Sequence, residues 1–132
     1  GISMKYKILK HLVEHLVLES KNQESKEKKK KVKFNISSEM GLSSENLKLV
    51  KFVNDIHLNS ELFTLEMKDS FFIELDHEID ESNTNQNNKI RDELLSLTFP
   101  YSRVTIMSMM VNFGYGDLSI PLIDLSERLK DE

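Results

Sequence analysis

Alternating apolar and polar residues constrain this chain more than any other feature of its sequence. Residues 32–37, 50–58 and 63–68 place apolar side chains at alternate positions, apart from Asn54. This alternation predicts β-strands that bury one face and expose the other. A further apolar set at positions 71, 73 and 75 is predicted to follow a bulge at Ser70. Turns are expected near residues 41–46 and 59–61.

The first apolar segment fits two structures. One set of its residues has the i, i+3, i+4 spacing of a helix: Ile8, Leu9, Leu12, Val13 and Leu16. Another set shares one strand parity: Tyr6, Ile8, Leu12, Leu16 and Leu18. Periodicity alone favours the helix.

The last third of the chain is predicted to be helical. The polar run 82–88 reads as a long connection, and Pro100 suits the first turn of the helix that follows. Gly114 is the expected residue just past the end of that helix, and a second, short helix is predicted from Asp124 to near Leu129. Strands grouped before helices indicate an α+β fold. We therefore expect a four-stranded antiparallel sheet with two C-terminal helices packed on one face.

Length and composition exclude several classes of protein. The 132 residues predict a single domain, residues 4–132, with residues 1–3 read as a cloning scar before Met4. The chain has no cysteine, which excludes disulfides and thiolate chemistry. A net charge of −4 argues against nucleic-acid binding, and the lack of a long apolar run predicts no membrane insertion. The basic run 26–33 and the acidic run 76–81 are expected to be solvated turns.

No group of residues has the spacing of a catalytic or metal site. His11 and His15, four positions apart, are expected to share a face as surface histidines, because a zinc site needs further ligands. The acidic run 76–81 lacks the glycine and the final glutamate of a calcium loop. We therefore predict a protein that is not an enzyme and has no metal or cofactor.

The methionines near the end of the predicted helix allow two interpretations. Met107, Met109 and Met110 lie on or beside an apolar stripe that includes Val104 and Val111. Such stripes usually pack in a core or between subunits. Methionine also suits an adaptable surface for varied apolar partners.

Residues 99–103 read FPYSR and lead into an apolar segment, after which residues 118–122 read LSIPL. This arrangement resembles the bacterial protein-export chaperone SecB, whose long helix opens on a similar element. Residues 32–44, 47–58 and 62–75 resemble the second and third strands of that family. On the same alignment, residues 12–19 match its first strand, so the resemblance implies a strand where periodicity favours a helix.

The resemblance implies an ATP-independent holdase that binds unfolded preproteins for export in the cytoplasm. It also implies a homotetramer built as a dimer of dimers, with Val104, Met107 and Val111 at the oligomer interface. The SecA motor would dock on the acidic sheet face, where Glu19 and Glu66 keep acids. Here His15 replaces an aspartate and Thr64 a leucine, and the C-terminus is short. These departures point to a divergent member.

Apolar residues near loop or helix ends are the candidates for client contact: Phe71, Phe72, Met110, Phe113, Tyr115 and Leu122. Two alternatives to a general holdase stay open. One is a SecB-like chaperone dedicated to a single partner, such as the antitoxin of a toxin–antitoxin system. The other is a non-catalytic oligomeric binding module.

Overall fold

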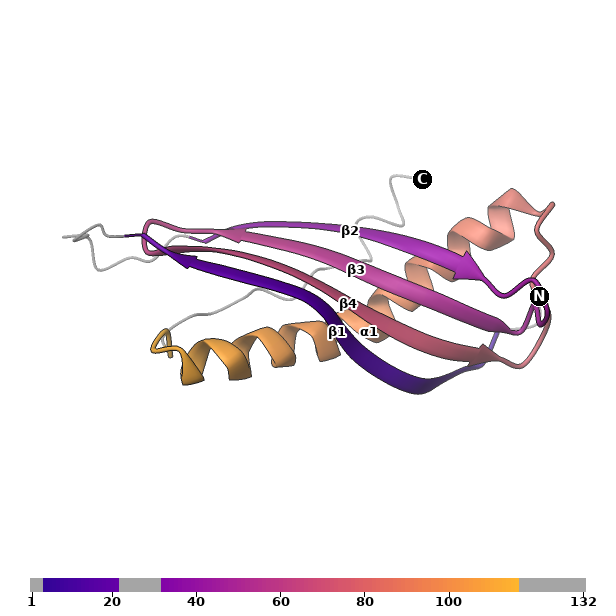
Figure 1. Ribbon diagram of the computed structural model, residues 1–132. Helices are drawn as coiled ribbons and strands as arrows, with labels where there is room; N and C mark the ends of the chain where they lie inside the picture. The colour runs from indigo at the N-terminus through magenta and orange to yellow at the C-terminus, as the bar shows by residue number, and fades with distance from the viewer. Residues whose placement is uncertain (1–3, 22–31, 117–132) are drawn as a thin grey trace.

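The computed structural model describes residues 4–21 and 32–116. Figure 1 shows two layers, a long twisted sheet and one helix that runs across a single face of it. The elements in chain order are β1 (Tyr6–Ser20), β2 (Lys33–Leu42), β3 (Leu49–Asn59), β4 (Phe63–Leu75) and α1 (Thr84–Asn112). The expected α+β class and four-stranded antiparallel sheet are confirmed. The second expected helix, from Asp124, lies outside the described residues.

The strands are ordered β1-β4-β3-β2, and every neighbouring pair is antiparallel. Two tight connections, residues 43–48 and 60–62, join β2 to β3 and β3 to β4, close to the turns that the sequence predicts. Among the described strands, β1 and β2 are therefore the two edges of the sheet.

The helix that periodicity favours for the first segment is wrong. This segment is β1, and it pairs with β4 from Tyr6 opposite Leu75 to Ser20 opposite Phe63. Register shifts between Ile8 and Lys10, and between Val13 and His15, each add one residue to β1. A bulge lengthens the spacing between residues on one face from two to three. Two bulges in one strand therefore imitate the spacing of a helix.

The bulge expected at Ser70 is not found. β4 pairs with β3 in one constant register, from Glu74 opposite Leu49 to Thr64 opposite Asn59. The buried apolar residues of β4 stay on odd positions from Phe63 to Leu75. The irregularities lie in the partner strand β1 instead.

Two expectations about α1 are also wrong. Thr84–Asn88, part of the run read as a connection, forms the first turns of the helix, and the Asn83 side chain caps it by accepting the Gln86 N–H at 3.1 Å. Pro100 lies inside the helix rather than in its first turn. Proline has no N–H to bond the carbonyl four residues earlier, and it bends a helix. Figure 1 shows α1 changing direction near its middle.

Gly114 ends α1 as predicted. Its φ of +92° is the left-handed conformation that glycine adopts without strain. The Gly114 N–H bonds the Val111 carbonyl at 3.2 Å, and the Tyr115 N–H bonds the Met110 carbonyl at 2.8 Å. This pair of bonds is the Schellman pattern of a helix C-terminus.

The core lies between α1 and one face of the sheet. Even-numbered residues of β3 and odd-numbered residues of β4 face the helix and are buried. From α1 they meet Ile90, Leu94, Leu95, Phe99, Ile106 and Met110. We call the other side of the sheet, away from α1, the open face.

By length and composition α1 is long and apolar enough to cross a bilayer. Core helices pass the same test, and one side of α1 is buried against the sheet from Ile90 to Met110. This property of α1 is therefore weak support for a membrane segment.

Shortening a buried side chain of α1 tests this packing. Leu94 is fully buried, whereas Ser96 is exposed on the same turn. We expect Leu94→Ala to lower the free energy of unfolding by about 2–5 kcal/mol, because it leaves a cavity. Ser96→Ala should change it by less than about 0.5 kcal/mol. Urea unfolding followed by circular dichroism measures both, and equal effects would contradict the packing of α1.

Candidate functional site

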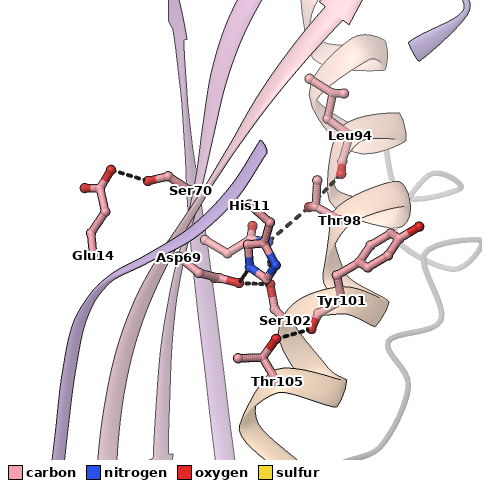
Figure 2. Close-up of polar contacts among 10 residues, drawn as sticks. His11, Glu14, Asp69, Ser70, Leu94, Thr98, Tyr101, Ser102 and Thr105 are labelled. Carbon is pink, nitrogen blue, oxygen red and sulfur yellow. Dashed lines mark hydrogen bonds and ion pairs between the residues drawn. The ribbon is translucent and has the colours of Figure 1, made fainter. Parts of the chain in front are cut away.

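A row of buried and partly buried polar side chains crosses the interface between α1 and the sheet. We call it the polar line; it consists of Ser38, Asn54, Thr98, Ser102, Asp69 and His11. Asn54 is fully buried, accepts from the Ser38 hydroxyl at 2.8 Å and donates to Thr98 at 3.0 Å and Ser102 at 3.2 Å. Figure 2 shows Asp69 held between His11 from β1 and Ser102 from α1. The polar line therefore joins all four strands to the helix.

Asp69 is the centre of this arrangement. Its side chain is fully buried, and its Oδ2 accepts from the Ser102 hydroxyl at 2.6 Å and from His11 Nε2 at 2.7 Å. Its Oδ1 has no hydrogen-bond partner among the described residues. Burial raises the pKa of the Asp69 carboxyl, and the bonds from Ser102 and His11 only partly oppose that shift.

The polar line brings a serine, a histidine and an aspartate together, but not in a catalytic order. In a nucleophilic triad, the histidine lies between the serine and the aspartate and takes the serine proton. Here the aspartate lies in the middle, and Ser102 donates to it directly. The His11 ring stacks on Phe71 at a centroid distance of 4.1 Å. This geometry positions α1 and does not activate Ser102.

The expectation that His11 and His15 share a face as surface histidines is wrong. His11 is partly buried on the helix side of the sheet, where it reaches Asp69. His15 lies after the second β1 bulge, opposite Lys68, and is half exposed on the open face near Glu66. The extra residue in the bulge puts the two rings on opposite faces.

Two of the three expected oligomer-interface residues lie on the side of α1 that faces away from the sheet, whereas Met107 packs partly against the core. Val104 and Val111 are 58% and 61% exposed, and Met107 is partly buried beside them. Tyr101 is exposed on the same side. We call these four residues the outer stripe. Their role at a subunit contact stays a prediction.

The expected client-contact residues are scattered. Phe71 and Met110 are fully buried in the core, so neither is accessible to a client in this conformation. Phe113 is exposed just after α1, and Phe72 is partly exposed on the open face. Tyr115 packs on Phe63 at a centroid distance of 4.9 Å. Leu122 lies outside the described residues.

Glu19 and Glu66, expected at a motor-docking surface, are exposed on the open face. Glu66 lies 3.5 Å from His57 and 3.9 Å from His15, and His57 lies 3.0 Å from Asp55. Within residues 4–21 and 32–116, no three histidine or acidic side chains are placed to hold a metal ion.

A groove runs between edge strand β2 and the N-terminal half of α1. It has a volume of about 240 Å³ and combines apolar walls with polar groups. Ile36 and Leu95 supply apolar surface, and Arg91 and Asp92 lie on its helix side. Asp92 Oδ2 is buried without a hydrogen-bond partner among the described residues. We call this feature the β2 groove; sequence reasoning missed it, because α1 was expected to start at Pro100.

Comparison with solved structures identifies the fold as that of a SecB-like chaperone. The Mycobacterium tuberculosis SecB-like chaperone Rv1957 aligns over 89% of this chain and 90% of its own, with a TM-score of 0.74 and 8% sequence identity. It was solved in complex with a ChAD peptide from the Rv1956 HigA1 antitoxin. A Streptococcus agalactiae protein of unknown function aligns over 93% of this chain and 100% of its own, with a TM-score of 0.59 and 11% identity.

The sequence itself matches no family model and no curated protein. The structural likeness nevertheless confirms the fold that the resemblance implies. The chain therefore has a SecB-like fold with a sequence that is only 8% identical to that of the neighbour.

The raised pKa of Asp69 predicts a specific pH dependence. The folded state holds the Asp69 proton more tightly than the unfolded chain does. In the unfolded chain the pKa of Asp69 has its ordinary value of 3.8. The contribution of Asp69 to stability therefore falls as pH rises from that value through the folded pKa. We expect the difference in unfolding free energy, wild type minus Asp69→Asn, to decrease over that window. Urea unfolding at a series of pH values measures it.

Glu14→Gln is the control for this experiment. Hydrogen bonds from Lys51 and Ser70 lower the pKa of the Glu14 carboxyl. The stability that Glu14 contributes is therefore lost as pH falls, which is the opposite sign. A wild type minus Asp69→Asn difference that is flat or rises with pH would show that burial does not dominate at Asp69.

Proposed function

We propose that this chain is an ATP-independent chaperone that binds extended or unfolded polypeptides. The observation that carries the proposal is the β2 groove beside an edge strand of a SecB-like fold. An edge strand offers backbone N–H and C=O groups to an added peptide strand, and neighbouring pockets take its side chains. This mode of binding recognises the backbone, so it accepts many sequences.

The chemistry of the β2 groove suits a peptide. Ile36 and Leu95 would cover apolar side chains of a client. The unpartnered Asp92 Oδ2 could accept a hydrogen bond from a backbone N–H of the client, and such a bond would remove the cost of leaving this oxygen buried alone. None of these steps needs a catalytic group or a nucleotide.

A dedicated partner is the second candidate function. It is favoured by the Mycobacterium tuberculosis neighbour, whose structure holds an antitoxin peptide. Recovery of one stoichiometric protein with the tagged chain would favour this alternative, whereas many clients would favour the general holdase. A role in preprotein export would add the SecA motor as partner and a cytoplasmic location. For SecA, the accessible acids are Glu19 and Glu66.

Self-association is part of the proposal. The outer stripe exposes several apolar side chains that no residue in the described part of the chain covers. Burying them against a second copy would stabilise an assembly, a dimer or a dimer of dimers.

An aggregation assay tests the holdase. We expect the purified chain to suppress aggregation of a reduced, denatured client without ATP, as measured by light scattering at several-fold excess. Ile36→Ser should weaken the suppression, because it removes an apolar wall of the β2 groove. Asn35→Ser is the matched control, since Asn35 lies on the same strand but on the open face. No suppression by the wild type would contradict the proposal.

A charge on the outer stripe tests the assembly. Light scattering coupled to size exclusion should give a dimer or tetramer for the wild type. Val104→Asp and Val111→Asp should shift it towards the monomer, because a buried unpaired carboxylate is costly. Asn112→Asp, exposed beside the stripe, should leave the mass unchanged. A wild-type monomer at micromolar concentration would rule out this role for the stripe.

A further inference from the structure

A second hollow lies on the open face, on the other side of the sheet from the β2 groove. It has a volume of about 450 Å³, and its lining is mostly apolar. We call it the Phe72 hollow; its lining residues on or beside the open face are Leu9, Gly41, Leu49, Lys51 and Phe72. Gly41, Lys51, Phe72 and Lys10 lie opposite one another on β2, β3, β4 and β1 in turn, so the hollow lies on a row that spans the sheet.

Phe72 is the one apolar β4 side chain on the open face, where Leu12 and Val17 of β1 are also exposed. The other β4 side chains of the open face are polar, namely Thr64, Glu66, Lys68, Ser70 and Glu74. Phe72 is nevertheless partly exposed, and Leu9, pushed out by the first β1 bulge, is 50% exposed. Gly41 adds no side chain to the row, which leaves space above the β2 backbone. The result is an apolar patch with a depression that an incoming side chain can fill.

The charges around Phe72 indicate the kind of partner. Lys51 lies on one side of Phe72, with its Nζ 5.7 Å from the ring centroid and 2.8 Å from Glu14. Lys10 lies on the other side, is exposed and forms no ion pair with any residue that the structure describes. Glu74 is the nearest acid along β4 on this face. An uncompensated lysine beside an apolar depression favours a partner that carries a negative charge next to an apolar group.

We propose that the Phe72 hollow binds a polypeptide segment in which a large apolar side chain stands next to acidic residues. The apolar side chain fills the space over Gly41 and contacts Phe72, Leu9 and Leu49. The neighbouring carboxylates meet Lys10 and compete with Glu14 for Lys51. The inference deepens the proposed function, because it rests on a polypeptide partner and names the sequence class that this chain would prefer. The preferred partner is acidic, whereas a partner that docks on an acidic sheet face would be basic.

Gly41→Val adds a side chain to the hollow, and the strand has room for its Cβ. A Cβ at Gly41 meets only the Lys51 carbonyl oxygen, at the ordinary contact distance of 3.8 Å. Gly41 is not among the residues with positive φ, and valine suits a strand. Lys10→Glu reverses the free charge, and Lys33→Glu is its matched control, because Lys33 is exposed at the other end of the same face.

The test measures fluorescence anisotropy of labelled short peptides. One peptide places a leucine between glutamates, the second places it between lysines, and the third replaces the leucine of the first by serine. We expect the first peptide to bind the wild type at least about tenfold more tightly than the other two. Gly41→Val and Lys10→Glu should each weaken it by roughly tenfold, and Lys33→Glu should not. Urea unfolding of Gly41→Val confirms that the variant is folded.

Three results would overturn the inference. They are equal binding of the acidic and basic peptides, binding that Gly41→Val does not change, and a change of oligomeric mass in Gly41→Val, which would identify a second copy as the occupant. The aggregation assay separates this site from the proposed function. Gly41→Val that still suppresses client aggregation but loses the acidic peptide supports both. If the wild type does not bind the acidic peptide but still suppresses client aggregation, the Phe72 hollow is disproved and the proposed function stands.

Discussion

The hydrogen bond from Ser102 to Asp69 is the constraint on which the arrangement of α1 depends. A fully buried carboxylate is costly unless donors reach it, and the described donors to its side chain are Ser102 and His11. Thr98 and Ser102 lie four residues apart, on one side of the helix, and Asn54 donates to both. Turning α1 by one residue would break these bonds together. The polar line therefore sets the rotation of the helix, and the rotation sets which residues form the outer stripe.

The sequence predicted the parts of the fold whose residues repeat without interruption. β2 and β3 keep a period of two, so their faces could be assigned, whereas a bulge was wrongly expected in β4 at Ser70. The faces of β1 could not be assigned, because its two bulges break the period. β1 is a strand because it pairs with β4, and periodicity does not reveal that pairing. The first half of α1 was missed for another reason. Its opening turn is rich in asparagine, a poor helix former, and its stability comes from Asn83 capping and the packing of Ile90 and Leu94.

The site was predicted less well than the fold. Spacing placed Val104 and Val111 on one apolar stripe, expected to pack in a core or between subunits, and both are exposed in the single chain. Phe71 and Met110 are as apolar as Phe72 and Phe113, but position on the strand or helix buries the first two. The polar line had a signal that went unused: Asn54 and Asp69 occupy positions whose neighbours at every second residue are apolar. A polar residue in the buried phase of a strand has to find a partner across the core.

The two sides of the sheet are suited to different tasks for a physical reason. The helix side is covered by α1, which the polar line holds in place, and at its edge lies the β2 groove, where an edge strand provides the backbone groups for a peptide of any sequence. The open face has no helix over it in the described chain, and its side chains, not its backbone, meet a partner. Contacts through side chains select for sequence, whereas contacts through the backbone do not. A chain with both can hold polypeptides broadly at one place and discriminate among them at the other.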